Sequence, residues 1–293
     1  MTDEKRKRIT IAIATVSALG LGAIGVKATS NIIENKKIER QQQEAKEAED
    51  KRIAELKAKY PGVGIKGLDD AYDASIVAEK LRKYDYRNNG EKVIFLTFDD
   101  GPSTTVTPEV LDTLKANDVK GTFFILGDTL QRSEESKKIL KQIYDDGNAI
   151  ANHSYSHDYK KLYPNRTLDF NTFKEDFQKN ENLIKEVLGK DFKTRVARCP
   201  GGYMSWKGMS ALDEYSKTNN ELIAIDWNAL NADAEGKKKS PDELVEHAIK
   251  TSEGKEMVVL LMHDTYGKEN TAKSLDKIIK HYKDNGYKFK VLG

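Results

Sequence analysis

Two adjacent carboxylates, Asp99 and Asp100, follow the apolar run VIFLTF, which is typical of a buried strand. Gly101 and Pro102 then turn the chain. Neighbouring side chains on a strand point to opposite faces, so two consecutive acidic residues cannot both be solvent-exposed on the same face. A carboxylate at a strand end can ligate a metal ion or take a proton from water. The pair marks a candidate catalytic site, although simple turn chemistry also places acids before Gly-Pro.

Two of the five histidines stand together, as His153 and His157 in the segment NHSYSH. Histidines four positions apart can converge on one metal ion, although taken alone the spacing also arises by surface coincidence. One aspartate and two histidines form a three-ligand set that leaves room for water, as in hydrolytic rather than structural metal sites. The second aspartate of the pair can then act as a general base.

Three further strand ends carry candidate residues. Arg198 stands in ARCPGG, where the glycine turn can present backbone N–H groups to an oxyanion. Asp226 and Trp227 stand in AIDWN, and His263 ends VVLLMHD. Singly these are explained by a salt bridge, a capping aspartate and a half-buried histidine. All five clusters nevertheless fall at the carboxyl ends of predicted strands, where parallel sheets carry their active sites.

The elements that position these residues alternate along the chain. Strands are predicted over residues 93–98, 121–125, 149–151, 195–198, 222–226, 257–262 and 289–292. Helices are predicted over residues 71–83, 108–117, 133–145, 172–188, 206–218, 241–251 and 271–285. This alternation predicts an α/β fold with a parallel sheet, open or closed into a barrel.

The N-terminal part is expected to lie outside this domain. Residues 1–8 form a basic cap and residues 9–26 an uncharged apolar run, which we interpret as a transmembrane signal-anchor rather than a cleaved signal peptide or a buried helix. The basic end then faces the cytoplasm, and the rest of the chain is extracellular. Residues 27–60 predict a charged helical stalk, favoured over a coiled coil, and residues 61–91 a linker with a short helix.

The composition of the chain limits the kinds of binding partner and of metal site that we expect. The formal net charge of +2 argues neither for a nucleic acid nor for an acidic polymer. Cys199 is the only cysteine, which excludes an internal disulfide and any cysteine-rich metal cluster. No protein partner is inferred.

The motifs TFDDGP, HSYSH, RCPGG, DWN and LLMHD, in this order, resemble those of the polysaccharide deacetylase (NodB homology) family, carbohydrate esterase family four. The resemblance covers about residues 92–292, within the domain expected over 92–293. It implies a distorted (β/α) barrel and metal-dependent removal of acetyl groups from acetylated sugars. By motif it implies Asp100, His153 and His157 as ligands of a divalent metal, usually Zn²⁺, with Co²⁺ or Mn²⁺ as alternatives.

The resemblance also implies catalytic roles. Asp99 is expected to be the general base, oriented and charge-balanced by Arg198. His263 is expected to be the general acid, and Asp226 is expected to hold its imidazole in the protonated form.

Substrate-binding residues follow in the same way. Trp227 and Leu261 are expected to wall the pocket for the acetyl methyl group. Where the family often has an aromatic residue, Gly201 and Gly202 follow the proline, with Tyr203 behind them. The oxyanion donor is therefore expected to be a backbone N–H near Gly201, and Tyr203 is a substrate-binding candidate.

Anchor, stalk and resemblance together predict a membrane-held enzyme that deacetylates N-acetylglucosamine of peptidoglycan. Within enzymes, the alternatives are deacetylases of chitin-like oligomers, xylan or an exopolysaccharide. From another class, the alternative is a catalytically inactive wall-binding domain, which would not need the base Asp99 or the acid His263.

Overall fold

The computed structural model describes residues 27–220 and 222–293. The chain divides into two units, with the boundary between Glu55 and Leu56 inside helix α2 (Lys27–Lys59). The helix predicted for the stalk is therefore present, and its side chains from residue 35 to residue 55 are mostly exposed. In the described part of the chain, no helix is both long enough and apolar enough to cross a bilayer. The predicted cap and anchor, residues 1–26, lie outside the described residues.

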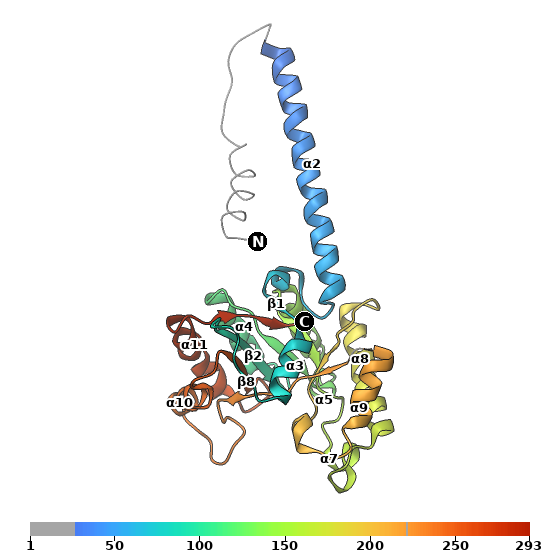
Figure 1. The fold of residues 1–293 in the computed structure, drawn as a ribbon, viewed down its shortest axis with the longest axis vertical. Helices are drawn as coiled ribbons and strands as arrows, with labels where there is room; N and C mark the ends of the chain where they lie inside the picture. The colour runs from blue at the N-terminus through green and yellow to red at the C-terminus, as the bar shows by residue number, and fades with distance from the viewer. Residues whose placement is uncertain (1–26, 221) are drawn as a thin grey trace. The chain divides into compact units, whose positions relative to one another are not determined.

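The second unit is built on one parallel sheet of eight strands, in the order β6-β5-β4-β3-β2-β8-β7, with β9 pairing beside the start of β2. The sheet curls into a half barrel (Figure 1). A separate parallel pair joins β1 to β10. The strands are β1 (Ala71–Tyr72), β2 (Val93–Asp99), β3 (Thr122–Ile125), β4 (Ala149–Asn152), β5 (Val196–Ala197), β6 (Ile223–Ala224), β7 (Ala229–Leu230), β8 (Met257–His263), β9 (Lys288–Phe289) and β10 (Val291–Leu292).

Helices cover the outer face of the sheet. Ile94, Leu96 and Phe98 of β2 alternate with inward-facing residues and join the larger apolar core. In Figure 1, α10 and α11 lie side by side on one side of the unit, and α8 and α9 lie on the other, where Phe173 of α8 and Leu212 of α9 share an apolar cluster. The helices of this unit are α3 (Ala74–Arg82), α4 (Val106–Ala116), α5 (Gly127–Leu130), α6 (Glu134–Asp145), α7 (Tyr159–Leu162), α8 (Phe170–Leu188), α9 (Ser210–Tyr215), α10 (Pro241–Ser252) and α11 (Glu269–Asp284).

Helix α3 packs on the inner face of the sheet. Val77 and Leu81 of this helix share an apolar cluster with Phe95 of β2, Val259 of β8 and Ile225. Between β6 and β7, at the ends of the strand order, no pairing occurs among the described residues. The amphipathic α3 therefore buries inner-face side chains that a closed barrel would bury between its own strands.

The predicted strands and helices are largely confirmed, with differences in length and boundaries and with several short elements that were not predicted. The strands predicted at 195–198 and 222–226 shorten to two residues each, and the one predicted at 289–292 splits into β9 and β10 in separate sheets. The helix predicted from residue 206 begins at Ser210. The helix predicted over 71–83 begins at Ala74, because Ala71 and Tyr72 form β1 instead. The strand β7 was not predicted, because two residues are too few to show a periodic pattern.

Residues 61–91 are not the linker that we predicted. Val63 is fully buried and bridges Ala149. β1 pairs with β10, and the N–H of Ala74 donates to the carbonyl of Gly293 at 2.9 Å. The compact unit accordingly begins at Leu56 instead of residue 92. The glycines and proline of this segment do not mark flexibility, because Gly64 and Gly67 lie so close to Tyr144 and Gly147 that a Cβ would clash with their backbone.

This packing predicts a stability effect inside the presumed linker. Val77 is fully buried and its neighbour Ile76 is 44% exposed on the same helix. Val77→Ala should lower the free energy of unfolding by about 2 kcal/mol through lost burial and the cavity left behind. Ile76→Ala is the matched control and should change it by less than about 0.5 kcal/mol. Denaturant unfolding measures both, and equal values would contradict the assignment of this segment to the core.

Candidate active site

The inner face of the sheet places the predicted residues side by side. Because every second residue shares a face, Phe95 is followed on the inner face by Thr97 and then Asp99. In the neighbouring segments, the site residues likewise lie two or four positions after a residue of the inner core. These pairs are Ala151 and His153, Val196 and Arg198, Ile225 and Trp227, and Val259 and His263, with Leu261 between the last two. Asp99 and His263 are direct register partners on β2 and β8.

A buried ion pair lies at the centre of this face. Arg198 is fully buried, and its Nη1 lies 2.6 Å from Oδ1 of Asp99. The same guanidinium donates to the Thr97 hydroxyl at 3.0 Å and to the Ile225 carbonyl at 3.0 Å. Burial raises the pKa of Asp99, and the positive charge of Arg198 opposes that rise. The contact expected between these two residues is present.

His153 is held in one tautomer. Its Nδ1 lies 2.8 Å from the carbonyl oxygen of Arg198, and because a carbonyl can only accept, Nδ1 carries the proton. Burial lowers the pKa of His153 to about 3, so the ring is neutral. Nε2 is then left with a free lone pair, which lies 3.4 Å from Oδ1 of Asp100. A neutral, oriented imidazole is the form that ligates a metal ion.

Asp100, His153 and His157 form a group whose ligand atoms all lie within 4.8 Å of one another. Oδ1 of Asp100 is buried without a hydrogen-bond partner and lies 3.7 Å from Nε2 of His157. The backbone of Asp100 has φ of 70° and that of His157 has φ of 52°, conformations that side chains other than glycine rarely adopt. An orphaned carboxylate oxygen facing two imidazole nitrogens fits a divalent metal ion.

The loop that carries the two histidines is fixed from below by α8. Asp176, a buried residue of this helix, accepts hydrogen bonds from the N–H groups of Tyr155 and Ser156 at 2.7 and 2.9 Å. Asn180, one turn further on, donates to Asn152 at 2.8 Å and to Ile125 at 2.7 Å. The roles of Asp176 and Asn180 were not predicted from the sequence, because a polar residue on a helix gives no sign of which loop it faces.

The partner predicted for His263 is wrong. Nδ1 of His263 lies 2.7 Å from Oδ1 of Asp233, and Oδ2 of Asp233 also accepts from the His263 N–H at 2.9 Å. The carboxylate of Asp226 instead accepts from the backbone N–H groups of Tyr203 and Met204 at 2.7 and 3.0 Å. Asp226 thus holds the loop after the third motif, because its side chain points to that loop and not to β8.

Asp233 charges the histidine that it holds. Burial alone lowers the pKa of His263. The hydrogen bond and the negative charge of Asp233 outweigh this effect and, with smaller contributions from Asp99 and Asp100, raise the pKa of His263 to about 9. Asp233 itself is nearly buried and also accepts from the Thr271 hydroxyl at 2.7 Å. The sequence gives no local signal for this pair, because the segment NADAEG lies 30 residues before His263 and is aligned with it only through the two-residue strand β7.

These side chains open into a cavity of about 330 Å³. Asp99, the three candidate ligands and His263 line it, together with Gly201, Trp227 and Leu261 as predicted. Tyr203 does not line this cavity, and its hydroxyl donates to Asp213 at 2.5 Å. Arg198 and Asp226 act from behind its wall. Tyr159, Asn231 and Glu235 also line the cavity and were not predicted from the sequence.

The new pairing gives a direct test. Replacing Asp233 by Asn removes the charge beside His263, so the pKa of His263 should fall from about 9 towards the ordinary histidine value of about 6.5. Asp226→Asn is the matched control and should leave that pKa near the wild-type value. NMR titration of the imidazole in metal-free protein measures both, and a shift with Asp226→Asn alone would restore the original assignment.

Comparison with known proteins supports the same family as the motifs do. The sequence profile of the polysaccharide deacetylase family matches residues 86–218. A peptidoglycan-N-acetylglucosamine deacetylase of Bacillus cereus is 30% identical over 204 residues, covering 69% of this chain and 86% of the relative. The peptidoglycan-N-acetylmuramic acid deacetylase PdaA of Bacillus subtilis is 29% identical, covering 72% of this chain and 74% of the relative.

A solved structure supports the fold as well. A Streptococcus mutans esterase of carbohydrate esterase family four superposes with a TM-score of 0.71 at 34% identity, covering 78% of this chain and 94% of that one. With the ordered motifs and the half-barrel sheet, these similarities confirm the family expected from the sequence. The chain belongs to the polysaccharide deacetylases, the hydrolases of carbohydrate esterase family four.

Proposed function

We propose that this chain is a metal-dependent enzyme that removes N-acetyl groups from cell-wall polysaccharide, foremost from N-acetylglucosamine of peptidoglycan. The observation that carries the proposal is the pairing of Asp99 and His263 as register partners beside the group formed by Asp100, His153 and His157. A base and an acid on adjacent strands can serve the two ends of one amide hydrolysis. The similarity to peptidoglycan deacetylases favours peptidoglycan as the polymer.

The ligand group would hold a divalent cation, foremost Zn²⁺, through Oδ1 of Asp100 and the Nε2 atoms of His153 and His157. When bound, such an ion would polarise the acetyl carbonyl and make a water molecule more acidic. His153 is prepared for this role, because its Nδ1 proton is committed to the Arg198 carbonyl.

The remaining steps belong to the chain's own side chains. Asp99 accepts the proton of the attacking water, and Arg198 keeps that carboxylate in place. The backbone N–H of Gly201, a residue that lines the cavity, donates to the acetyl oxygen as negative charge develops there. His263 protonates the amine nitrogen as the C–N bond breaks, because an amide anion is too poor a leaving group. Trp227 and Leu261 enclose the methyl group.

Acetate release tests the reaction. Purified protein loaded with Zn²⁺ should release acetate from peptidoglycan, and mass analysis of the digested muropeptides should locate the free amine on glucosamine. A free amine on muramic acid would correct the sugar assignment. Activity confined to xylan or to chitin-like oligomers would correct the polymer. Absence of acetate from every polymer, with metal bound, would support the wall-binding alternative.

Variants of the ligands and the base separate metal binding from chemistry. His153→Ala or His157→Ala should lose metal and activity together, because each removes one of three ligands. Asp99→Asn should keep the metal and slow turnover by about 10²–10⁴-fold, because an amide cannot take the proton. Elemental analysis and acetate release measure the two effects.

The base variant requires a stability control. Asp99→Asn leaves the buried Arg198 charge without its counter-ion, which can cost about 3–5 kcal/mol. Thermal unfolding must therefore show that the variant is folded at the assay temperature. If Asp100→Asn kept the metal while Asp99→Asn lost it, the two carboxylates would exchange roles.

The acid predicts the alkaline side of the pH profile. A general acid must be protonated, so kcat/KM should fall as the pH rises through the pKa of His263, near 9. Asp233→Asn lowers that pKa, so the fall should begin at lower pH, whereas Asp226→Asn should leave it in place. The pH dependence of kcat/KM measures this, and an alkaline limb that does not move in Asp233→Asn would remove His263 from the role.

For the location we propose a membrane-held chain with its catalytic domain outside the cell. The basic cap before the apolar run of residues 9–26 supports this orientation. Protease added to intact cells or protoplasts should digest the domain, and protection from protease would overturn the topology. Recovery of the domain in the medium would indicate cleavage instead of anchoring.

A further inference from the structure

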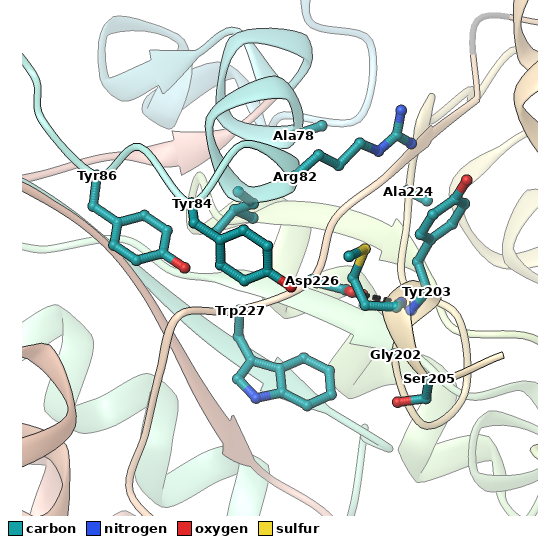
Figure 2. A pocket seen from close by; sticks show the side chains of 12 residues that line it. Ala78, Arg82, Tyr84, Tyr86, Gly202, Tyr203, Ser205, Ala224, Asp226 and Trp227 are labelled. Carbon is teal, nitrogen blue, oxygen red and sulfur yellow. Dashed lines mark hydrogen bonds between the residues drawn. The ribbon is translucent and has the colours of Figure 1, made fainter.

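A second cavity, of about 200 Å³, lies beside the active-site cavity, and Trp227 lines both. Figure 2 shows the indole of Trp227 facing Tyr84, with Tyr86 on one side and the Tyr203 loop on the other. The neighbouring glycines divide in the same way, since Gly201 lines the active-site cavity and Gly202 the second one. One side chain therefore separates the two spaces.

The second cavity exposes aromatic and apolar surface. Tyr84 is 68% exposed and Met204 is 53% exposed, which places both among the most exposed large apolar side chains of the described residues. Tyr86, Tyr203 and Trp227 add further ring surface to the lining. Rings left open to solvent in a concave site, next to polar groups, are typical of ligand-binding surfaces.

The walls of this cavity are held in place without a ligand. Asp226 fixes the backbone of Tyr203 and Met204 through two hydrogen bonds of 2.7 and 3.0 Å. The guanidinium of Arg82 lies 4.7 Å from the centroid of the Tyr203 ring and pairs with Asp213 at 3.2 Å. A site that is rigid before binding loses less conformational entropy when the ligand arrives.

We propose that this cavity binds the sugar ring next to the one that is deacetylated. The proposal rests on the proposed function, because only a polymeric substrate has a second ring at that place. A pyranose ring has C–H groups on its faces, which can pack on Tyr84 or Trp227, and hydroxyl groups at its edge, which can bond to tyrosine hydroxyls and to Arg82. Trp227 lines both cavities, so a sugar ring bound in the second cavity would lie next to the one in the active site.

Two residues that line this cavity, Arg82 and Tyr84, precede the part of the chain that the family profile matches. The family profile begins at residue 86, whereas α3 ends at Arg82 and Tyr84 lies two residues further on. The backbone of Tyr84 has φ of 53°, an uncommon conformation for tyrosine, and the position is held by a hydrogen bond from its N–H to Leu81 at 3.1 Å. The segment before the family match thus contributes to the choice of substrate length.

Chain-length dependence tests the proposal. The full chain is assayed on monomeric N-acetylglucosamine and on its β-linked pentamer, and the ratio of the two kcat/KM values is the readout. Tyr84→Ala should lower the pentamer-to-monomer ratio by about 3- to 10-fold, the size of an aromatic contact. Tyr84→Phe keeps the ring and should keep the ratio. Ile76→Ala, an exposed change on the helix α3 that precedes Tyr84, is the matched control.

A binding measurement separates this proposal from the proposed function. In Asp99→Asn protein, calorimetric titration with the pentamer should show a dissociation constant about 3- to 10-fold higher when Tyr84→Ala is added. If the wild type releases no acetate but this difference persists, the reaction is wrong and the sugar site stands. An unchanged ratio and unchanged binding in folded Tyr84→Ala protein would overturn the sugar site.

Discussion

The buried pair of Arg198 and Asp99 is the interaction on which the rest of the site depends. A guanidinium without solvent must be neutralised and its donors satisfied, and here Asp99, Thr97 and the Ile225 carbonyl do so. The carbonyl of Arg198 in turn orients His153. Arg198 therefore fixes Asp99, the proposed base, with its side chain and His153, a metal-ligand candidate, with its backbone carbonyl, so the two cannot shift independently.

The two sides of the site are supported in different ways. On the histidine loop, backbone N–H groups donate to Asp176 of α8, so a helix fixes the position of the candidate ligands. Beside β8, the carboxylate of Asp233 contacts both the ring and the backbone of His263, so it sets charge and position together. Because separate elements support the two histidines, their pKa values can differ within one cavity. Burial lowers the pKa of His153, and the carboxylate of Asp233 raises the pKa of His263.

What could be predicted from the sequence follows a simple physical distinction. Long apolar strands such as β2 and β8 show their own pattern, and chemistry-bearing residues at their ends, such as Asp99 and His263, follow from the rule that parallel strands end at one edge. Asp233 could not be found, because its role depends on the alignment of a two-residue strand with a distant one. Asp226 was misassigned for the related reason that a carboxylate after a strand does not reveal which way its side chain turns. Residues 61–91 resembled a linker because the glycines that permit close backbone packing also occur in flexible segments.

The pairing of β1 with β10 has a consequence for how the domain is made. Among the described residues, Ala71 and Tyr72 pair with Val291 and Leu292 alone, so more than two hundred residues lie between the two halves of this small sheet. During synthesis, the first strand and the helix after it are made long before the segment that completes them, and bringing the two ends of so long a segment together carries an entropic cost. The aromatic wall at Tyr84 belongs to the same early segment. The β1–β10 pair can therefore form only after synthesis has reached Leu292, whereas the apolar face of α3 can pack on β2 before that.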